Sequence, residues 1–378
     1  MKKLVILTPS FWDSANKKLK IGGLETYIKL LSSLGINNGY NIIIYQFDNV
    51  KSSIKIEHEN MVINSMPYST SSNQKIFDQI FLEHNSKDTI FIIATDQMDI
   101  KSKSDNVISI QHGIAFDIPG YMIKGFWGKS KTLQLINKVL RCIKNVQRLY
   151  MTKNTVCVDY NYYNWFRTLG TIYNDKKIVV IPNCTSSFIT EQELEDKLSQ
   201  KRRIKKIVFA RRFVDYRGTI LFANIVDRIL DKHKNVEITF AGSGPLEDML
   251  KKRFENNPMI KFTTFSSEDS ISFHKDYDIA LVPTIFSEGT SLSICEAMAA
   301  GCLGIATHVG GLTNIIIDYH NGLMAAPNEE DLYKTINTAL SMHNNEFVRL
   351  VKNGYYTAKE ALSISIWNKK WLSFLNKI

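Results

Sequence analysis

Short apolar runs alternate with amphipathic stretches along most of the chain, and this alternation predicts strands separated by helices. Strands buried on both faces are typical of parallel sheets covered by helices, which is the doubly wound α/β architecture. Eleven runs fit such strands: 4–7, 41–47, 89–94, 107–110, 155–158, 178–181, 206–210, 236–241, 260–265, 279–282 and 303–307.

The number of predicted strands and the length of 378 residues favour two domains. A polar, charged segment at 184–203 separates two strand-like runs, so we place the linker there. We expect an N-terminal Rossmann-like domain over 1–184 and a C-terminal one over 203–362. Residues 363–378 carry apolar side chains at helical spacing, and we expect this helix to pack back on the first domain.

Composition indicates an ordinary globular protein, with 44% hydrophobic and 22% charged residues. No apolar run reaches the roughly 18 residues that span a bilayer, and the short N-terminal run fits a first strand better than a signal peptide. Five scattered cysteines, none in CxxC spacing, indicate reduced thiols. We therefore expect a cytoplasmic protein, peripheral on the inner face of the cytoplasmic membrane if its basic surface binds lipid.

Candidate chemistry concentrates in the C-terminal half, where Glu288 and Glu296 flank a predicted helix start. Ser291 and Ser293 can cap that helix, which begins near Leu292. Free N–H groups at a helix start bind anions, with help from the helix dipole. A diphosphate would sit there, with Glu288 toward a sugar and Glu296 toward ribose hydroxyls. A capped helix with two surface glutamates is the alternative interpretation.

Two loops that follow strands add candidate phosphate and backbone contacts. Arg212 and Arg217 flank a strand-to-helix loop, the place where doubly wound folds bind ligands, and guanidinium groups suit phosphate oxygens. Gly242 and Gly244 permit a tight turn before a helix that starts at Pro245. The spacing does not meet the GxGxxG dinucleotide fingerprint.

The order of these segments resembles the retaining glycosyltransferases of family 4, which have the GT-B fold. That family pairs a strand-end arginine with a lysine, follows with a GxGP-type turn, and places two glutamates with seven residues between them. Here Arg212 and Arg217 stand at the basic positions, and Glu288 and Glu296 at the glutamates. The position before Arg212, usually glycine in that family, is Arg211. The resemblance covers most of residues 205–330 and implies two Rossmann-like domains facing across a cleft.

The N-terminal half resembles the family more weakly. Gly22 and Gly23 look like its glycine pair between first strand and first helix, with an ordinary turn as the alternative. His112 follows a strand and matches a histidine that the family places near the donor sugar, although a lone histidine is more often structural. Asn183 matches the family's segment before the interdomain linker.

The resemblance implies transfer of a sugar from a nucleoside diphosphate with retention at the anomeric carbon. Glu288 and His112 would contact the sugar, and Arg212, Arg217 and the helix start at Ser291 and Leu292 would stabilise the leaving diphosphate. We expect a UDP-hexose donor and no cofactor. Asp276 and Asp278 form a DxD pattern, but both fit element boundaries, so we predict metal-independent catalysis.

A basic stretch supplies a candidate membrane contact. Residues 119–154 contain no acidic side chain, and apolar residues interleave with eight basic ones: Lys124, Lys129, Lys131, Lys138, Arg141, Lys144, Arg148 and Lys153. Such a helix suits an anionic bilayer surface, and a solvated basic face over a core helix is the alternative. Membrane contact fits a lipid-linked or polysaccharide acceptor in bacterial surface glycan or lipopolysaccharide synthesis.

The formal charge of +10 attracts phosphate-bearing partners without choosing among them. No zinc motif or RNP-like strand points to nucleic acid, so we expect none as a partner. Two other functions remain open at this level: a GT-B sugar-nucleotide epimerase or phosphorylase, and a non-catalytic partner protein that binds sugar nucleotides.

Overall fold

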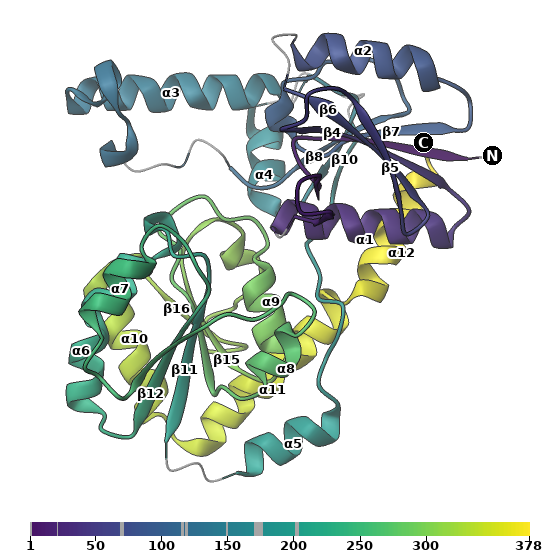
Figure 1. Ribbon diagram of the computed structural model, residues 1–378. Helices are drawn as coiled ribbons and strands as arrows, with labels where there is room; N and C mark the ends of the chain where they lie inside the picture. Colours follow the sequence, from purple (N-terminus) through teal and green to yellow (C-terminus); the bar gives the residue numbers. More distant parts are fainter. Residues whose placement is uncertain are drawn as a thin grey trace. The chain divides into compact units, whose positions relative to one another are not determined.

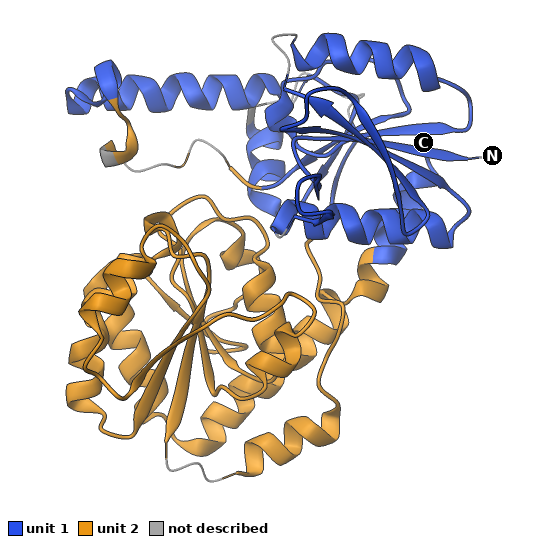
Figure 2. Cartoon of the chain, viewed as in Figure 1, with its two compact units in different colours: residues 1–112, 125–181, 368–378 blue, residues 113–124, 182–367 orange. Residues whose placement is uncertain are grey.

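The computed structural model describes residues 2–20, 22–68, 72–114, 117, 120–148, 150–169, 177–200 and 204–378. The chain divides into two compact units, coloured separately in Figure 2. Unit 1 comprises residues 1–112, 125–181 and 368–378, and unit 2 comprises residues 113–124 and 182–367. The short segment 113–124 therefore belongs to unit 2, although the predicted boundary placed it in the N-terminal domain.

Unit 1 contains, within the described residues, an eight-stranded sheet of order β10-β9-β8-β7-β1-β4-β6-β5. All neighbours pair in parallel except β5 and β6, which are antiparallel. The helices α1 and α2 cover opposite faces of this sheet (Figure 1). The strands are β1 Lys3–Thr8, β4 Asn41–Asp48, β5 Ile54–His58, β6 Met61–Pro67, β7 Thr89–Ile93, β8 Val107–Gln111, β9 Asn154–Cys157 and β10 Lys177–Val180, with a small hairpin of β2 Trp12–Asp13 and β3 Lys18–Leu19. The helices are α1 Gly23–Asn37, α2 Asn73–His84, α3 Lys131–Arg148 and α4 Tyr160–Leu169, with 3₁₀ turns η1 Asp96–Met98 and η3 Gly125–Gly128.

Unit 2 contains, in its described part, a six-stranded parallel sheet of order β13-β12-β11-β14-β15-β16. The chain leaves β11 in one direction and returns at β14 to continue in the other, so the order reverses between these two strands. The strands are β11 Lys205–Ala210, β12 Val236–Ala241, β13 Ile260–Thr263, β14 Ile279–Val282, β15 Leu303–Thr307 and β16 Leu323–Ala325.

Helices lie on both faces of this second sheet (Figure 1). Phe209, Phe222 and Phe240 form the aromatic centre of the core, with Phe222 and Phe240 ring centroids 5.3 Å apart. Burial of each such side chain stabilises the fold by about 1.5–3 kcal/mol. The helices are α5 Glu191–Ser199, α6 Thr219–Lys232, α7 Glu247–Arg253, α8 Ser270–His274, α9 Leu292–Ala299, α10 Glu329–Ser341 and α11 Asn344–Ala361, with 3₁₀ turns η2 Gly120–Met122, η4 Asp215–Arg217 and η5 Gly310–Asn314.

The polar segment that we expected to be a linker is largely an ordered part of unit 2. Thr190 and Glu193 form a capping box that starts α5, and Leu194 of this helix is fully buried. The Lys197 Nζ is also buried and donates to the Ala300 carbonyl, 2.8 Å away, at the C-terminal end of α9. The charge of the segment reflects one solvated helix face, which is why composition alone resembles a linker. Residues 201–203 of the expected linker lie outside the described residues.

The C-terminal helix α12, Ile364–Leu375, contributes its first residues to unit 2 and the rest to unit 1. Within unit 1, Trp371 is fully buried and its Nε1 donates to the Tyr27 hydroxyl on α1, at 3.1 Å. None of the helices in the described ranges combines the length and apolar character needed to cross a bilayer.

Candidate functional site

The site begins where β11 and β14 end, at the reversal of strand order in unit 2. In open α/β sheets ligands bind outside the carboxyl ends of the strands at such a point. The loop after β11 leads through Arg211 and Arg217 into α6, and the loop after β14 carries Glu288 into α9. Topology therefore brings these two loops together.

Glu288 is the centre of this site. Its carboxylate is buried, and Oε2 accepts hydrogen bonds from Arg211 Nη2 at 2.7 Å, from Arg217 Nη1, and from the Thr284 hydroxyl at 2.9 Å. Burial alone would raise the pKa of this carboxyl, but the two guanidinium groups hold it below its ordinary value. Glu288 is thus a carboxylate at neutral pH, and Oε1 receives no hydrogen bond from the described residues.

The basic residue beside Glu288 at the end of β11 is Arg211, whereas sequence analysis chose Arg212. The N–H groups of Arg211 and Phe213 both bond toward the segment after β12, so these two residues share one phase of an extended backbone and Arg212 has the other. Arg211 and Phe213 are buried. Arg212 is exposed, and its guanidinium contacts none of the described side chains, so its donor contact stays a prediction.

Ser291 is the N-cap residue of α9 but does not cap it. Its hydroxyl instead accepts a hydrogen bond from Arg211 Nη1 at 2.9 Å, and no side chain in the described ranges caps this helix. Leu292 is the first helical residue and Ser293 the second, so neither the Ser291 nor the Ser293 cap that we expected is present. The first N–H groups of α9 remain available to an anion beside two arginines.

Glu296 lies one helical turn further along α9, where its Oε2 accepts a 2.6 Å hydrogen bond from Ser270 of α8. Burial raises the pKa of Glu296 to about 7, and the Ser270 hydrogen bond opposes this only partly. The second predicted glutamate therefore changes its protonation state near neutral pH, unlike Glu288.

Glycines hold the two loops in place. A Cβ at Gly242 would lie 2.2 Å from the Arg211 carbonyl oxygen, and one at Gly244 would lie 2.6 Å from that of Phe213. Both glycines also have positive φ. The turn that we assigned to donor binding thus packs directly against the arginine loop, and direct donor contact by these glycines stays a prediction.

Gly310 supports the other side of the site in the same way. A Cβ there would lie 2.1 Å from the Glu288 carbonyl oxygen, and Gly311 N donates to that oxygen at 2.8 Å. Asn183 donates from its side-chain amide to the Thr290 carbonyl at 2.6 Å, next to the start of α9. Sequence analysis noted these residues only as part of a family pattern. Their role in supporting the loops depends on contacts across unit 2.

The predicted N-terminal residues lie in unit 1. Gly22 is the extended N-cap of α1, where a Cβ would lie 2.2 Å from the Glu25 carboxylate, and Gly23 has open space around it. His112 Nε2 donates to the Ala94 carbonyl at 2.8 Å, and burial lowers the pKa of His112 to about 4. The imidazole is therefore neutral, with Nδ1 as its acceptor nitrogen.

The DxD pattern has a structural explanation at its second residue. Asp278 is buried before β14, and its Oδ2 accepts a 2.8 Å hydrogen bond from the backbone N–H of Lys206 in β11. Asp276 is exposed at the end of the α8 segment. Among the residues that the structure describes, no group of three or more histidine, cysteine or acidic side chains could hold a metal ion.

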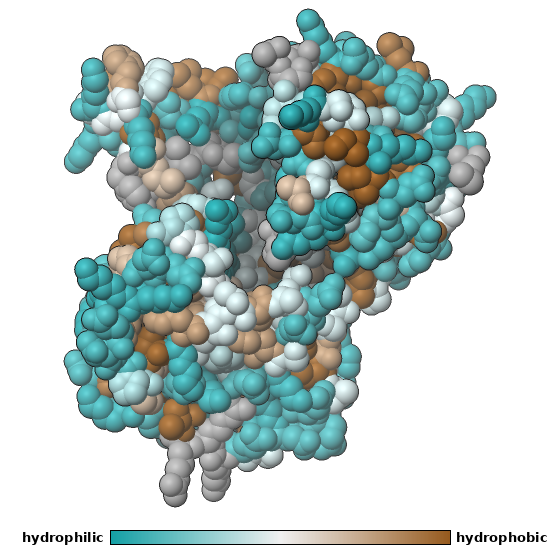
Figure 3. All heavy atoms as spheres, viewed as in Figure 1, coloured by the Kyte–Doolittle hydropathy of each residue, from teal (hydrophilic) through white to brown (hydrophobic). Residues whose placement is uncertain are grey.

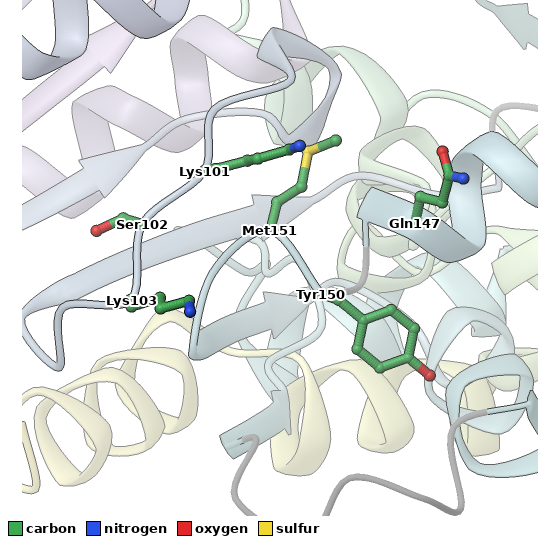
Figure 4. A pocket seen from close by; sticks show the side chains of 6 residues that line it. All are labelled: Lys101, Ser102, Lys103, Gln147, Tyr150 and Met151. Carbon is green, nitrogen blue, oxygen red and sulfur yellow. The ribbon is translucent and has the colours of Figure 1, made fainter.

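Unit 1 also contains a pocket of about 560 Å³ (Figure 4). Its walls come from the loop after η1 and from the end of α3 with the turn that follows it. The lining residues are Lys101, Ser102, Lys103, Gln147, Tyr150 and Met151. None of them was predicted as a site residue, and the pocket has no buried charged group.

Solved structures with the same architecture match the whole chain. A sucrose-phosphate synthase from Thermosynechococcus elongatus superposes with a TM-score of 0.74 at 14% identity, covering 100% of this chain and 99% of that one. HepE from Anabaena, solved in complex with UDP and glucose, gives a TM-score of 0.70 at 12% identity, covering 100% of each chain. The protein therefore has the GT-B fold.

Sequence comparison gives the family. Residues 190–357 match the model of the glycosyl transferases group 1, and the chain belongs to this family through its C-terminal unit. An uncharacterized glycosyltransferase of Methanocaldococcus jannaschii is 30% identical, over 52% of this chain and 58% of the relative. Protein CapJ of Staphylococcus aureus is 25% identical, over 53% and 48%. The chain spans about half the length of these curated relatives.

Proposed function

We propose that the protein transfers a sugar from a nucleoside diphosphate donor with retention at the anomeric carbon. The observation that carries the proposal is the cluster of Arg217, Arg211 and Glu288 beside the uncapped start of α9. Guanidinium groups and a helix N-terminus stabilise the negative charge that develops on a leaving diphosphate. Glu288 Oε1 is placed to accept a hydrogen bond from a donor hydroxyl.

We further propose UDP-hexose as the donor, because HepE is solved with UDP and glucose. His112 would accept a hydrogen bond from a sugar hydroxyl at Nδ1, since Nε2 already donates to Ala94. The acceptor would be lipid-linked or a polysaccharide in bacterial surface glycan synthesis. One relative is named as a human phosphatidylinositol N-acetylglucosaminyltransferase subunit, whose name includes a lipid (22% identity, over 78% of this chain).

A donor panel tests this function. The protein is incubated with UDP-, GDP- and ADP-sugars and candidate acceptors, nucleoside diphosphate release is measured, and the anomeric configuration of the product is read by NMR. Release with a UDP-hexose, retained configuration and unchanged rate in a chelator are expected. Binding of the nucleotide without release would support a non-catalytic partner instead, and loss of rate in the chelator would contradict metal independence.

The pH dependence of nucleoside binding tests the role of Glu296. If its carboxylate accepts hydrogen bonds from the ribose, uridine affinity rises as pH passes through about 7, because Glu296 ionises there. Charged hydrogen bonds exceed neutral ones by about 1 kcal/mol, so we expect roughly a fivefold rise in affinity between pH 6 and pH 8. Uridine carries no phosphate that titrates in this range. NMR titration should show the rise for the wild type and a flat profile for Glu296→Gln, and equal slopes would exclude the role.

We also propose that α3 binds an anionic membrane surface on the inner face of the cytoplasmic membrane. Its C-terminal end is anchored to unit 1, because Asp99 pairs with Lys144 at 2.9 Å and with Arg148 at 2.5 Å. The helix projects from the sheet of that unit (Figure 1), and Figure 3 shows apolar residues among the polar ones along it. Five apolar side chains of α3 are between 43% and 62% exposed: Leu135, Ile136, Val139, Leu140 and Ile143.

These apolar residues lie at spacings of one, three and four along the helix, so they form one stripe. An exposed apolar stripe with basic neighbours and no acidic residue matches the chemistry of an anionic interface. The alternative, a core helix with a solvated basic face, is wrong for this stripe, because its apolar side is exposed. Pro119 and Leu149 of the predicted basic stretch lie outside the described residues.

Vesicle flotation tests the membrane proposal. Burial of one leucine contributes about 1.5–3 kcal/mol, so Leu140→Asp should weaken binding to anionic vesicles roughly 10- to 100-fold. Leu82→Asp is the matched control, because Leu82 on α2 of the same unit is 81% exposed. Equal binding of the wild type to neutral and anionic vesicles, or equal loss in both variants, would refute the proposal.

A further inference from the structure

The two arginines that contact Glu288 differ in how deeply they are buried. The Arg211 side chain is 5% exposed and that of Arg217 is 28% exposed, while the Glu288 side chain is 8% exposed. Both guanidinium groups bond to the same oxygen, Oε2. One carboxylate thus has two cations, and only one of the cations is accessible to a ligand.

Arg211 is fixed at both ends of its guanidinium group. Nη2 donates to Glu288 at 2.7 Å and Nη1 donates to the Ser291 hydroxyl at 2.9 Å. Its backbone is held by the hydrogen bond from Arg211 N to the Ala241 carbonyl and by the close approach of Gly242. Movement of Arg211 away from Glu288 would leave two buried polar groups without partners, which is costly.

Arg217 is held less tightly. It lies in the short 3₁₀ turn η4, its guanidinium stacks at 5.1 Å from the centroid of the Tyr216 ring, and its printed polar contact is with Glu288. A diphosphate at the start of α9 offers oxygens with more charge than a carboxylate already shared with Arg211. Arg217 can therefore exchange one acceptor for the other.

We propose that Arg211 is a positioning residue that serves as the permanent counter-ion of Glu288, which frees Arg217 to move from Glu288 to the diphosphate when the donor binds. The inference deepens the proposed function, on which it rests. Arg211 occupies the position that is usually glycine in the family that the sequence resembles, so this device belongs to the present chain. It keeps Glu288 ionised and Oε1 available throughout binding.

The consequence is a prediction about protons. A buried carboxylate that loses its counter-ion takes up a proton, because burial favours the neutral form. With Arg211 present, transfer of Arg217 leaves Glu288 still paired. With glycine at 211, the same transfer leaves Glu288 alone, so binding of the diphosphate must be linked to proton uptake. Other titratable groups that interact with this pair are Tyr216 of η4 and Cys295 of α9.

The test measures proton uptake on binding of UDP by calorimetry in buffers of different ionisation enthalpy, between pH 5.5 and 8.5. Relative to the wild type, Arg211→Gly should take up as much as one additional proton, and its dissociation constant should rise by as much as about tenfold per pH unit where that uptake is complete. Ionisation of UDP and of Glu296 contributes to both proteins and cancels in the difference.

Two further variants assign the effect to Glu288. Arg211→Lys keeps the charge and should return the proton count to that of the wild type. The double variant Arg211→Gly/Glu288→Gln has no carboxylate to protonate and should also lack the additional proton. If Arg211→Gly does not fold while the double variant does, the unpaired carboxylate is the defect, which supports the counter-ion role.

The outcomes separate the two proposals. If the wild type binds no nucleoside diphosphate, the proposed function fails and the inference fails with it. If the wild type binds UDP but Arg211→Gly has the same proton count, or Arg211→Lys behaves as Arg211→Gly does, the counter-ion role is overturned while the proposed function stands.

Discussion

Glu288→Ala is expected to lower the free energy of unfolding of unit 2 by about 3–5 kcal/mol, the usual effect of removing one member of a buried ion pair. The reason is Arg211, whose buried guanidinium would lose its carboxylate and retain only the Ser291 hydroxyl. Arg217 contributes less to this loss because its side chain is partly solvated.

Hydrogen exchange of β14 and β15 reports on unit 2 alone and avoids treating the two units as one cooperative transition. Glu360→Ala is the control, since Glu360 is exposed on α11 and its loss should change stability by less than about 0.5 kcal/mol. Equal protection in the two variants would mean that Glu288 is not paired as described.

Arg217→Ala is expected to reduce kcat/KM for the sugar donor about 10²- to 10³-fold, because loss of one preorganised donor to a developing oxyanion has this effect. Arg217→Lys should retain more activity, since a lysine can still place a positive charge near the diphosphate. Steady-state assays of nucleoside diphosphate release measure both changes.

The control for this comparison is Arg228→Ala. Arg228 lies on α6, its side chain is 47% exposed, and it pairs with Glu330 at 3.1 Å, away from the ends of β11 and β14. A loss of activity with Arg228→Ala as large as that with Arg217→Ala would indicate a general effect of surface charge rather than a phosphate contact.

The strands of both sheets were predictable because most are buried on both faces and therefore form apolar runs. All eleven predicted runs correspond to strands in the structure. The hairpin of β5 and β6 was missed because its residues alternate with polar ones and β5 is largely exposed at the edge of its sheet. The three-residue β16 is too short to give a pattern.

The candidate site was predictable in its loops but not in its pairs. Spacing placed Glu288 and Arg217 in two loops that topology joins, and the structure shows them in contact. The choice between Arg211 and Arg212 depends on the phase of the backbone after β11, which the sequence does not encode locally. The roles of Ser270 and Thr284 depend on contacts with residues from other elements or later in the loop.

The helix α5 and the Asn183 amide determine where chimeras of this fold can be joined. A recombinant C-terminal fragment that starts at residue 204 would lose Leu194 from its core and the amide that supports Thr290. Exchange of donor specificity between related enzymes should therefore use a crossover between Ile181 and Pro182, where the chain passes from one unit to the other.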